Sequence, residues 1–321
     1  MTMTSPAVTS AILLALVCSP AVATPQDPAS QPSKTTFRSA VDVVSVAAVV
    51  RDKHGRFASR LTKDDFVVME GGVPRDIVQF HADANAPVRL ALLFDVSGSM
   101  RIGDRIDEAR QAARYVLGAL RLADAADEAA VFSFDMNLQS LQPFTVDAGA
   151  IETALSRVTP YGQTSLYDAI AQTAQRVADT RPGDPHRRAV VVFTDGVDTS
   201  SLMTPERVSS LASEIDVPVY VVTVVSPSEY EDRGGRGGAQ QGPLRTLAQW
   251  TGGDLFVTSA PAHESLAARQ IVDELRHQYV LAFNASPAAA AGWRSVDVKT
   301  RDRDLTVRAR RGYAAGARAG S

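Results

Sequence analysis

Acidic and hydroxyl side chains follow two strongly apolar runs of the sequence. Asp95, Ser97 and Ser99 come directly after one run, and Asp195 comes two residues after another. Runs of this kind predict parallel strands buried on both faces, and the carboxyl ends of such strands share one edge of the sheet. The two aspartates are therefore expected to face one crevice, where their charges would repel. A divalent cation between them removes that repulsion, and the serine hydroxyls would complete an oxygen-only site.

The elements that must position these residues are predicted from hydrophobic periodicity. Apolar strands alternate with amphipathic helices between residues 88 and 275, which predicts an α/β fold with a mostly parallel sheet and helices on both faces. The predicted strands are 89–94, 189–193 and 217–225, with a hairpin of 130–134 and 138–145, and the predicted helices are 104–120, 165–179, 205–215, 244–251 and 264–275.

Short strand patterns lie on both sides of this α/β segment. They occupy residues 41–50, 66–69 and 77–80 before it, and 278–283, 295–299 and 305–309 after it. Two or three strands alone bury too little apolar surface to be stable. We therefore expect the two flanks to pair into one small β-sandwich, with the α/β domain inserted between its halves.

The N-terminus predicts export. An apolar run is followed by small residues that end at Ala23, as in a secretory signal peptide, so the mature protein is expected in the periplasm or outside the cell. Cys18 is the single cysteine and lies in the predicted leader, which excludes disulfides and thiol catalysis in the mature chain. Leu16 and Val17 precede it where a lipoprotein signal requires a small residue, so acylation is disfavoured. The expected divisions are a signal peptide at 1–23, a disordered linker at 24–37, sandwich halves at 38–86 and 277–314, the α/β domain at 87–276 and a disordered tail at 315–321.

Three segments together resemble the metal-ion-dependent adhesion site (MIDAS) of von Willebrand factor type A (VWA) domains: Asp95-Val-Ser97-Gly-Ser99, Gly162-Gln-Thr164 and Thr194-Asp195-Gly196. The resemblance covers about residues 88–275 and implies a Rossmann-like VWA domain. It implies that Ser97, Ser99 and Thr164 bind Mg²⁺ (or Mn²⁺ or Ca²⁺) directly or nearly so, and that Asp95 and Asp195 hold the ion through water. The flanks, at 61–72 and 307–313, resemble those of bacterial secreted VWFA-related proteins.

This ligand set predicts binding of a partner protein. With mostly neutral inner ligands the ion stays a good Lewis acid, and an open coordination position would accept an Asp or Glu carboxylate of the partner. An alternative is a structural or assembly component of the cell envelope, in which the metal stabilises the sheet edge. A metal-assisted hydrolase would need a general base, and the motif has no His beside it. We therefore expect no enzymatic activity and no catalytic residue.

Other features indicate ordinary structural roles. The composition, with 45% hydrophobic and 21% charged residues and a net charge of −3, is typical of a soluble globular protein and predicts neither nucleic-acid binding nor an integral membrane segment in the mature chain. Asp198 is interpreted as a turn or cap residue and Asp168 as a first-turn helix charge. Trp250 and Trp293 are interpreted as core or cover for the β-flanks. The glycine-rich stretch at 233–238 predicts a solvated loop.

Overall fold

The fold is described from a computed structural model, in which residues 43–124, 126–178, 184–214, 216–232, 242–286 and 292–315 are described. The predicted signal peptide, the linker and the arginines of the glycine-rich loop lie outside these residues. The described residues, from Val43 to Ala315, form one compact unit. No helix in the described part is both long and apolar enough to cross a bilayer.

A six-stranded sheet forms the centre of the α/β part. Its strand order is β10-β9-β8-β5-β6-β7, and every strand is parallel to its neighbours except β7, which pairs antiparallel with β6. The strands are β5 (Val88–Asp95), β6 (Glu128–Phe134), β7 (Leu138–Thr145), β8 (Arg187–Thr194), β9 (Val219–Val224) and β10 (Leu255–Thr258). The expected α/β class and the antiparallel hairpin are confirmed.

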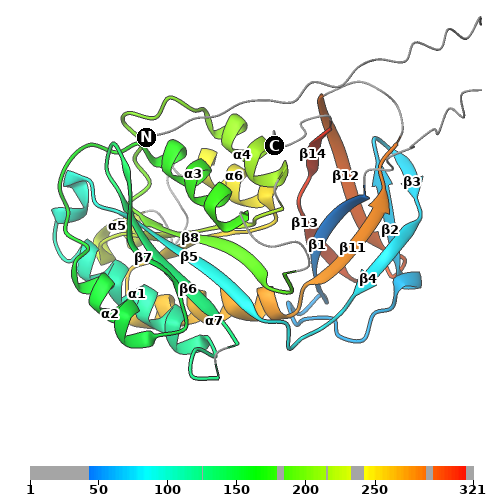
Figure 1. The fold of residues 1–321 in the computed structure, drawn as a ribbon, viewed down its shortest axis with the longest axis horizontal. Helices are drawn as coiled ribbons and strands as arrows, with labels where there is room; N and C mark the ends of the chain where they lie inside the picture. The colour runs from blue at the N-terminus through cyan, green and yellow to red at the C-terminus, as the bar shows by residue number, and fades with distance from the viewer. Residues whose placement is uncertain are drawn as a thin grey trace, which may run out of the picture. The chain divides into compact units, whose positions relative to one another are not determined.

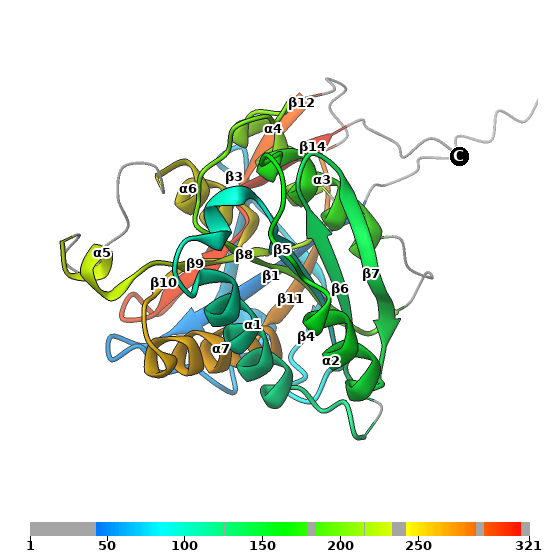
Figure 2. The same cartoon turned by 90° about the vertical axis from the view of Figure 1, so that its left-hand side faces the viewer.

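Helices cover both faces of this sheet (Figures 1 and 2). One apolar core joins one face of the sheet to α1, α2 and α7, and a second joins the other face to α3, α4 and α6. The helices are α1 (Arg105–Ala119), α2 (Ala148–Ser156), α3 (Leu166–Ala178), α4 (Pro205–Glu214), α5 (Pro227–Asp232), α6 (Gly242–Thr251) and α7 (Pro261–Arg276). The sequence analysis did not predict α2, α5 or β10, of which α5 and β10 have only six and four residues.

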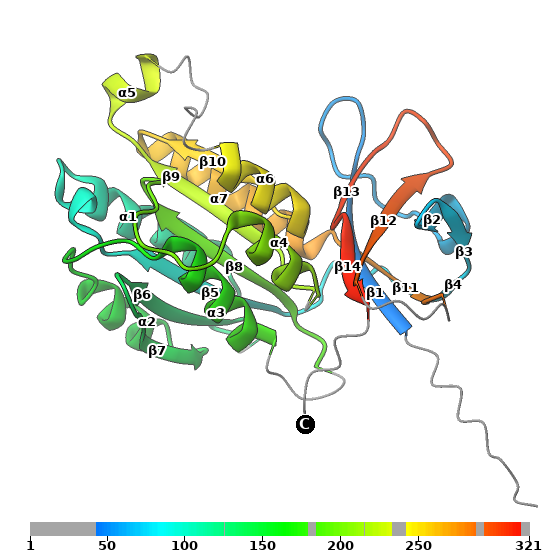
Figure 3. The same cartoon turned by 90° about the horizontal axis from the view of Figure 1, so that it is seen from above.

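The flanking strands pair with one another rather than with the central sheet (Figure 3). They make two four-stranded sheets, β13-β1-β11-β4 and β14-β12-β2-β3, and each combines strands from before and after the α/β part. One apolar cluster contains residues of both sheets, such as Val46, Phe66, Leu281 and Val298. The strands are β1 (Val43–Arg51), β2 (Phe66–Glu70), β3 (Val73–Arg75), β4 (Ile77–His81), β11 (Tyr279–Asn284), β12 (Gly292–Thr300), β13 (Thr306–Ala309) and β14 (Gly312–Ala315). The last strand therefore runs one residue into the predicted tail.

Charged and aromatic contacts join the flanking sheets to the α/β part. Glu274 of α7 is fully buried and accepts hydrogen bonds from Arg51 of β1, at 2.9 Å, and from Arg308 of β13. Trp250 of α6 and Trp293 of β12 stack with their ring centroids 5.8 Å apart. A buried carboxylate with two guanidinium partners is costly to leave unpaired, so these contacts stabilise the junction.

Candidate metal-binding edge of the sheet

The first candidate side chain, Asp95, is held at the end of the buried strand β5. It has no exposed surface, its Oδ1 accepts from the Ser97 backbone N–H at 2.9 Å, and its Oδ2 accepts from Thr194 Oγ1 at 2.6 Å. Burial is the largest cause of the raised pKa of Asp95, about 6, and the charge of Asp195 contributes to the same rise. The charge of Asp195 therefore adds to the cost of ionising Asp95.

The two serines lie on the turn that follows β5. Ser97 precedes a short 3₁₀ helix (Gly98–Arg101), and its Oγ lies 3.1 Å from Ser99 Oγ. The Gly98 N–H donates to the Gly162 carbonyl at 3.0 Å. That bond holds the segment carrying Thr164 against the serine turn.

Thr164 lies on the loop before α3 and is 3% exposed. Its carbonyl accepts from the backbone N–H groups of Thr199 and Ser200 at 3.0 and 2.9 Å. Its own N–H donates to Thr199 Oγ1 at 3.1 Å. These bonds tie the Thr164 loop to the loop that follows β8 and carries Asp195.

Asp195 is engaged by an arginine that the sequence reasoning did not identify. Arg105 Nη1 donates to Asp195 Oδ2 at 3.2 Å and to the Ser99 carbonyl at 3.3 Å. Its Nη2 donates to both carboxylate oxygens of Glu229 in α5, at 2.9 and 3.1 Å. No sequence signal joins Arg105 to Glu229, because the two residues are 124 positions apart and α5 was not predicted. The guanidinium of Arg105 therefore lies at the same edge of the sheet where the metal ion is predicted.

Comparison with known proteins identifies this part of the chain. Residues 90–197 match the von Willebrand factor type A domain family. The chain contains a VWA domain. A curated relative, the thrombospondin-related anonymous protein of Plasmodium falciparum, is 32% identical over 124 residues, which make up 36% of this chain and 22% of that protein.

Solved structures are also similar to this chain. BatB from Bacteroides thetaiotaomicron has 19% identity and a TM-score of 0.49 over 59% of this chain and 98% of its own. Proximal thread matrix protein 1 from the mussel byssus, solved with a zinc-occupied MIDAS motif, has 17% identity and a TM-score of 0.48 over 64% of this chain and 49% of its own.

The donor set of the VWA domain fits a hard divalent cation. Two carboxylates and three hydroxyls are the oxygen ligands that Mg²⁺ and Mn²⁺ prefer. Asp95 has the burial and the raised pKa of a carboxylate that a nearby cation would stabilise. Within the described residues no group of three or more His, Cys, Asp or Glu side chains is placed to hold a metal. A site at this edge would therefore depend on the hydroxyls.

Two further aspartates organise the loops of the VWA domain. Asp198 Oδ1 accepts from the Leu166 N–H at 2.8 Å and from Ser201 Oγ at 2.6 Å, so it caps the first turn of α3. The carboxylate of Asp168 accepts from the N–H groups of Leu202 and Met203, both at 2.9 Å. Both side chains hold the loop after β8 in place.

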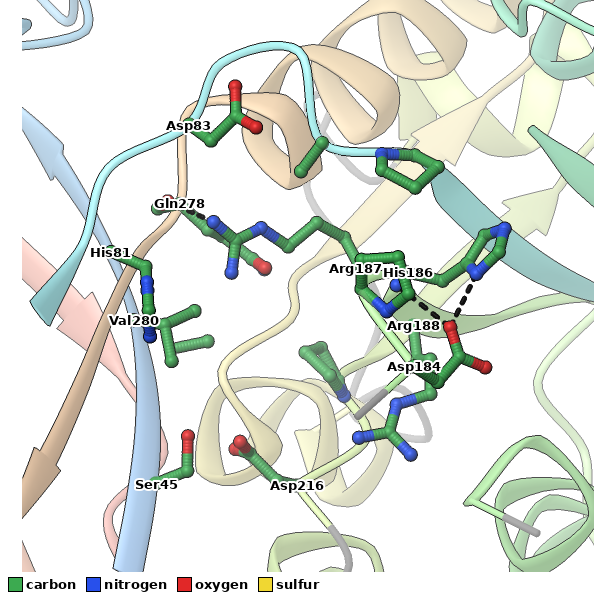
Figure 4. Close-up of a pocket in the computed structure, with 15 residues that line it drawn as sticks. Ser45, His81, Asp83, Asp184, His186, Arg187, Arg188, Asp216, Gln278 and Val280 are labelled. Carbon is green, nitrogen blue, oxygen red and sulfur yellow. Dashed lines mark hydrogen bonds and ion pairs between the residues drawn. The ribbon is translucent and has the colours of Figure 1, made fainter. Parts of the chain in front are cut away.

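A cavity of about 430 Å³ opens at the other edge of the sheet, where β8 begins (Figure 4). Its charged residues largely pair among themselves or with neighbours. Asp184 binds Arg89 at 3.1 Å and also His186, and Arg187 donates to the Gln278 carbonyl at 3.3 Å. We assign this cavity no role.

Proposed function

We propose that this chain is an exported binding protein whose VWA domain holds one divalent cation through Ser97, Ser99 and Thr164. Mg²⁺ is the favoured ion. Asp95 and Asp195 would supply the negative charge around the ion. A partner protein would complete the coordination with an Asp or Glu carboxylate. The observation that carries the proposal is the buried Asp95 carboxylate, which is positioned by hydrogen bonds beside a second carboxylate and a pair of serine hydroxyls.

Binding is favoured over catalysis because the two carboxylates are already engaged. Both oxygens of Asp95 accept hydrogen bonds, and Asp195 accepts from Arg105 and from the Val197 N–H. A general base needs a carboxylate or imidazole free to take a proton from the substrate. The arrangement supports holding an ion in place more directly than it supports proton transfer.

Partner capture tests this function. The tagged chain is incubated with a cell-envelope fraction in Mg²⁺ or in EDTA, and the bound proteins are identified by mass spectrometry. Ser99→Ala is the test variant, and Ser140→Ala, which changes an exposed serine in β7, is the matched control. We expect a partner that is captured in Mg²⁺ by the wild type and by the control but not by Ser99→Ala. Capture that persists in EDTA would contradict the proposal.

The Ser99→Ala variant, which removes a partly exposed hydroxyl, separates adhesion from a purely structural role of the metal. If the ion serves partner binding, this variant loses the partner and keeps its melting temperature. Loss of stability with partner binding intact would instead support a structural or assembly component.

A further inference from the structure

Large apolar side chains are exposed on the loops around the candidate metal site. Leu202 is 94% exposed and Tyr161 is 77% exposed, although leucine and tyrosine usually bury most of their surface. Of the eleven exposed large apolar side chains in the described part of the chain, five belong to this edge of the VWA domain. We call these five the apolar rim: Ile102, Met136, Tyr161, Val197 and Leu202.

The apolar rim is built around the predicted metal ligands. Ile102 follows Ser99 by three positions, Tyr161 precedes Thr164 by three, and Val197 follows Asp195 by two. Met136 lies in the turn after β6, the strand beside β5. Each ligand-bearing loop therefore carries at least one exposed apolar side chain.

Hydrogen bonds tie the loops that carry the rim to one another. The backbone N–H groups of Gly98, Ser165 and Thr199 donate to the carbonyls of Gly162, Asp135 and Thr164 at 3.0, 2.8 and 3.0 Å. Leu202 is held through its own N–H by Asp168. Since these bonds fix the backbone, the rim is presented without the ordering cost that a flexible loop would add on binding.

Single exposed apolar residues are normal on a protein surface, but several gathered at one site mark an interaction surface. Exposed charge on the same loops is limited, within the described residues, to Arg101, Asp104 and Arg157, which sum to one positive charge. The rim therefore offers mainly apolar contact around the acidic centre.

We infer that the apolar rim docks a partner segment in which an Asp or Glu is flanked by large apolar residues. The carboxylate goes to the ion and the apolar neighbours pack on the rim, so apolar contact sets the specificity. This inference rests on the proposed function, because the carboxylate needs the metal. It adds what the partner must carry beside the carboxylate.

A random dodecapeptide library displayed on phage tests the inference. Phage are bound to the immobilised chain in Mg²⁺ and eluted with EDTA. We expect the eluted peptides to carry an Asp or Glu with large apolar residues beside it, compared with the unselected library. Acidic peptides without that apolar enrichment would overturn the inference and leave the proposed function standing. Failure to recover acidic peptides by EDTA elution would overturn both.

Variants of the rim give a second test with the best selected peptide. We expect Leu202→Ser and Tyr161→Ser each to weaken peptide binding about tenfold, equal to about 1.4 kcal/mol, and to leave Mg²⁺ binding unchanged. Leu266→Ser is the matched control, since Leu266 is 66% exposed but lies on α7 outside the rim, and we expect its affinity within about twofold of wild type. Equal affinities of the rim variants and the control would overturn the inference.

Salt dependence separates apolar from charged recognition of the same peptide. Raising NaCl from about 50 to 500 mM screens exposed charges but leaves apolar contact intact. We expect the affinity to change less than about threefold. A tenfold loss would show that charge, and not the apolar rim, selects the partner.

Discussion

Replacing Arg105 by glutamine should increase the affinity of the VWA domain for Mg²⁺. Arg105 and Asp195 are only 14% and 6% exposed, and they share one charge-assisted hydrogen bond of 3.2 Å. Hydrogen bonds to charged groups contribute about 1.5–3 kcal/mol, and the length of this one favours the lower end. Because an incoming cation competes with the guanidinium for Asp195, removing Arg105 should tighten Mg²⁺ binding by about 1.4 kcal/mol, or about tenfold.

Titration calorimetry with Mg²⁺ measures this change directly. Arg105→Lys is the control, because it keeps the positive charge and should bind Mg²⁺ with an affinity close to that of the wild type. Glu229→Gln removes the carboxylate that offsets the charge of Arg105 and should weaken Mg²⁺ binding severalfold. If Arg105→Gln binds Mg²⁺ more weakly than the wild type, Arg105 supports the geometry of the site and the reasoning from charge competition is wrong.

Three further predictions concern stability, each measured by chemical denaturation. Burial raises the pKa of Glu264 from 4.5 to about 7, so the contribution of Glu264 to wild-type stability falls as pH rises from about 4.5 to 7. Glu264→Gln should therefore be more stable than wild type by about 3 kcal/mol at pH 8 and gain little at pH 4.5. A flat difference across this range would refute the assigned burial. Glu274→Ala should cost about 1.5–3 kcal/mol because it removes the buried carboxylate that accepts from Arg51 and Arg308, although Arg308 keeps its bond to Asp254 at 2.9 Å. A loss below about 1 kcal/mol would contradict the junction described above. Gly253→Ala should destabilise by about 1–3 kcal/mol because the added Cβ would lie 2.1 Å from the Val219 carbonyl oxygen, whereas Gly118→Ala, in open helix surface, should not.

The α/β fold could be predicted from the sequence because its strands carry an unusually clear signal. β5, β8 and β9 contain nearly continuous apolar runs that are buried on both faces, and the helices between them repeat apolar residues at helical spacing. The short elements gave no such signal. β10 has four residues, and α2 begins with Ala148-Gly149-Ala150, which does not distinguish an apolar face from a polar one.

The loops of the candidate site could be predicted from the sequence, but some of the side chains that lie beside them could not. Asp95, Ser97 and Ser99 lie in one motif, and the common edge of a parallel sheet explains why Asp195 joins them. The guanidinium of Arg105 could not be predicted, because its contact with Asp195 depends on how α1 is placed on the sheet. The apolar rim was not predicted either. Hydropathy shows that a leucine is apolar, but it does not show whether the loop that carries the leucine leaves its side chain exposed to solvent.

The pairing of the two flanks followed from a physical argument and not from a motif. Strands too few to form a core alone were expected to combine, and β1 pairs with β11 and β13, while β2 pairs with β12. The contacts that join these sheets to the VWA domain could not be read from the sequence. Glu274 is 223 positions from Arg51, and nothing local indicates that the two side chains meet.

Mg²⁺ uptake by the folded chain tests the central claim most directly. Titration calorimetry should show one Mg²⁺ bound per wild-type chain. The double variant Ser97→Ala, Ser99→Ala should bind none while its thermal unfolding without metal stays like that of the wild type. Absence of Mg²⁺ and Mn²⁺ uptake by the folded wild-type chain, or uptake by the double variant with unchanged affinity, would contradict the assignment of the metal to this edge of the sheet.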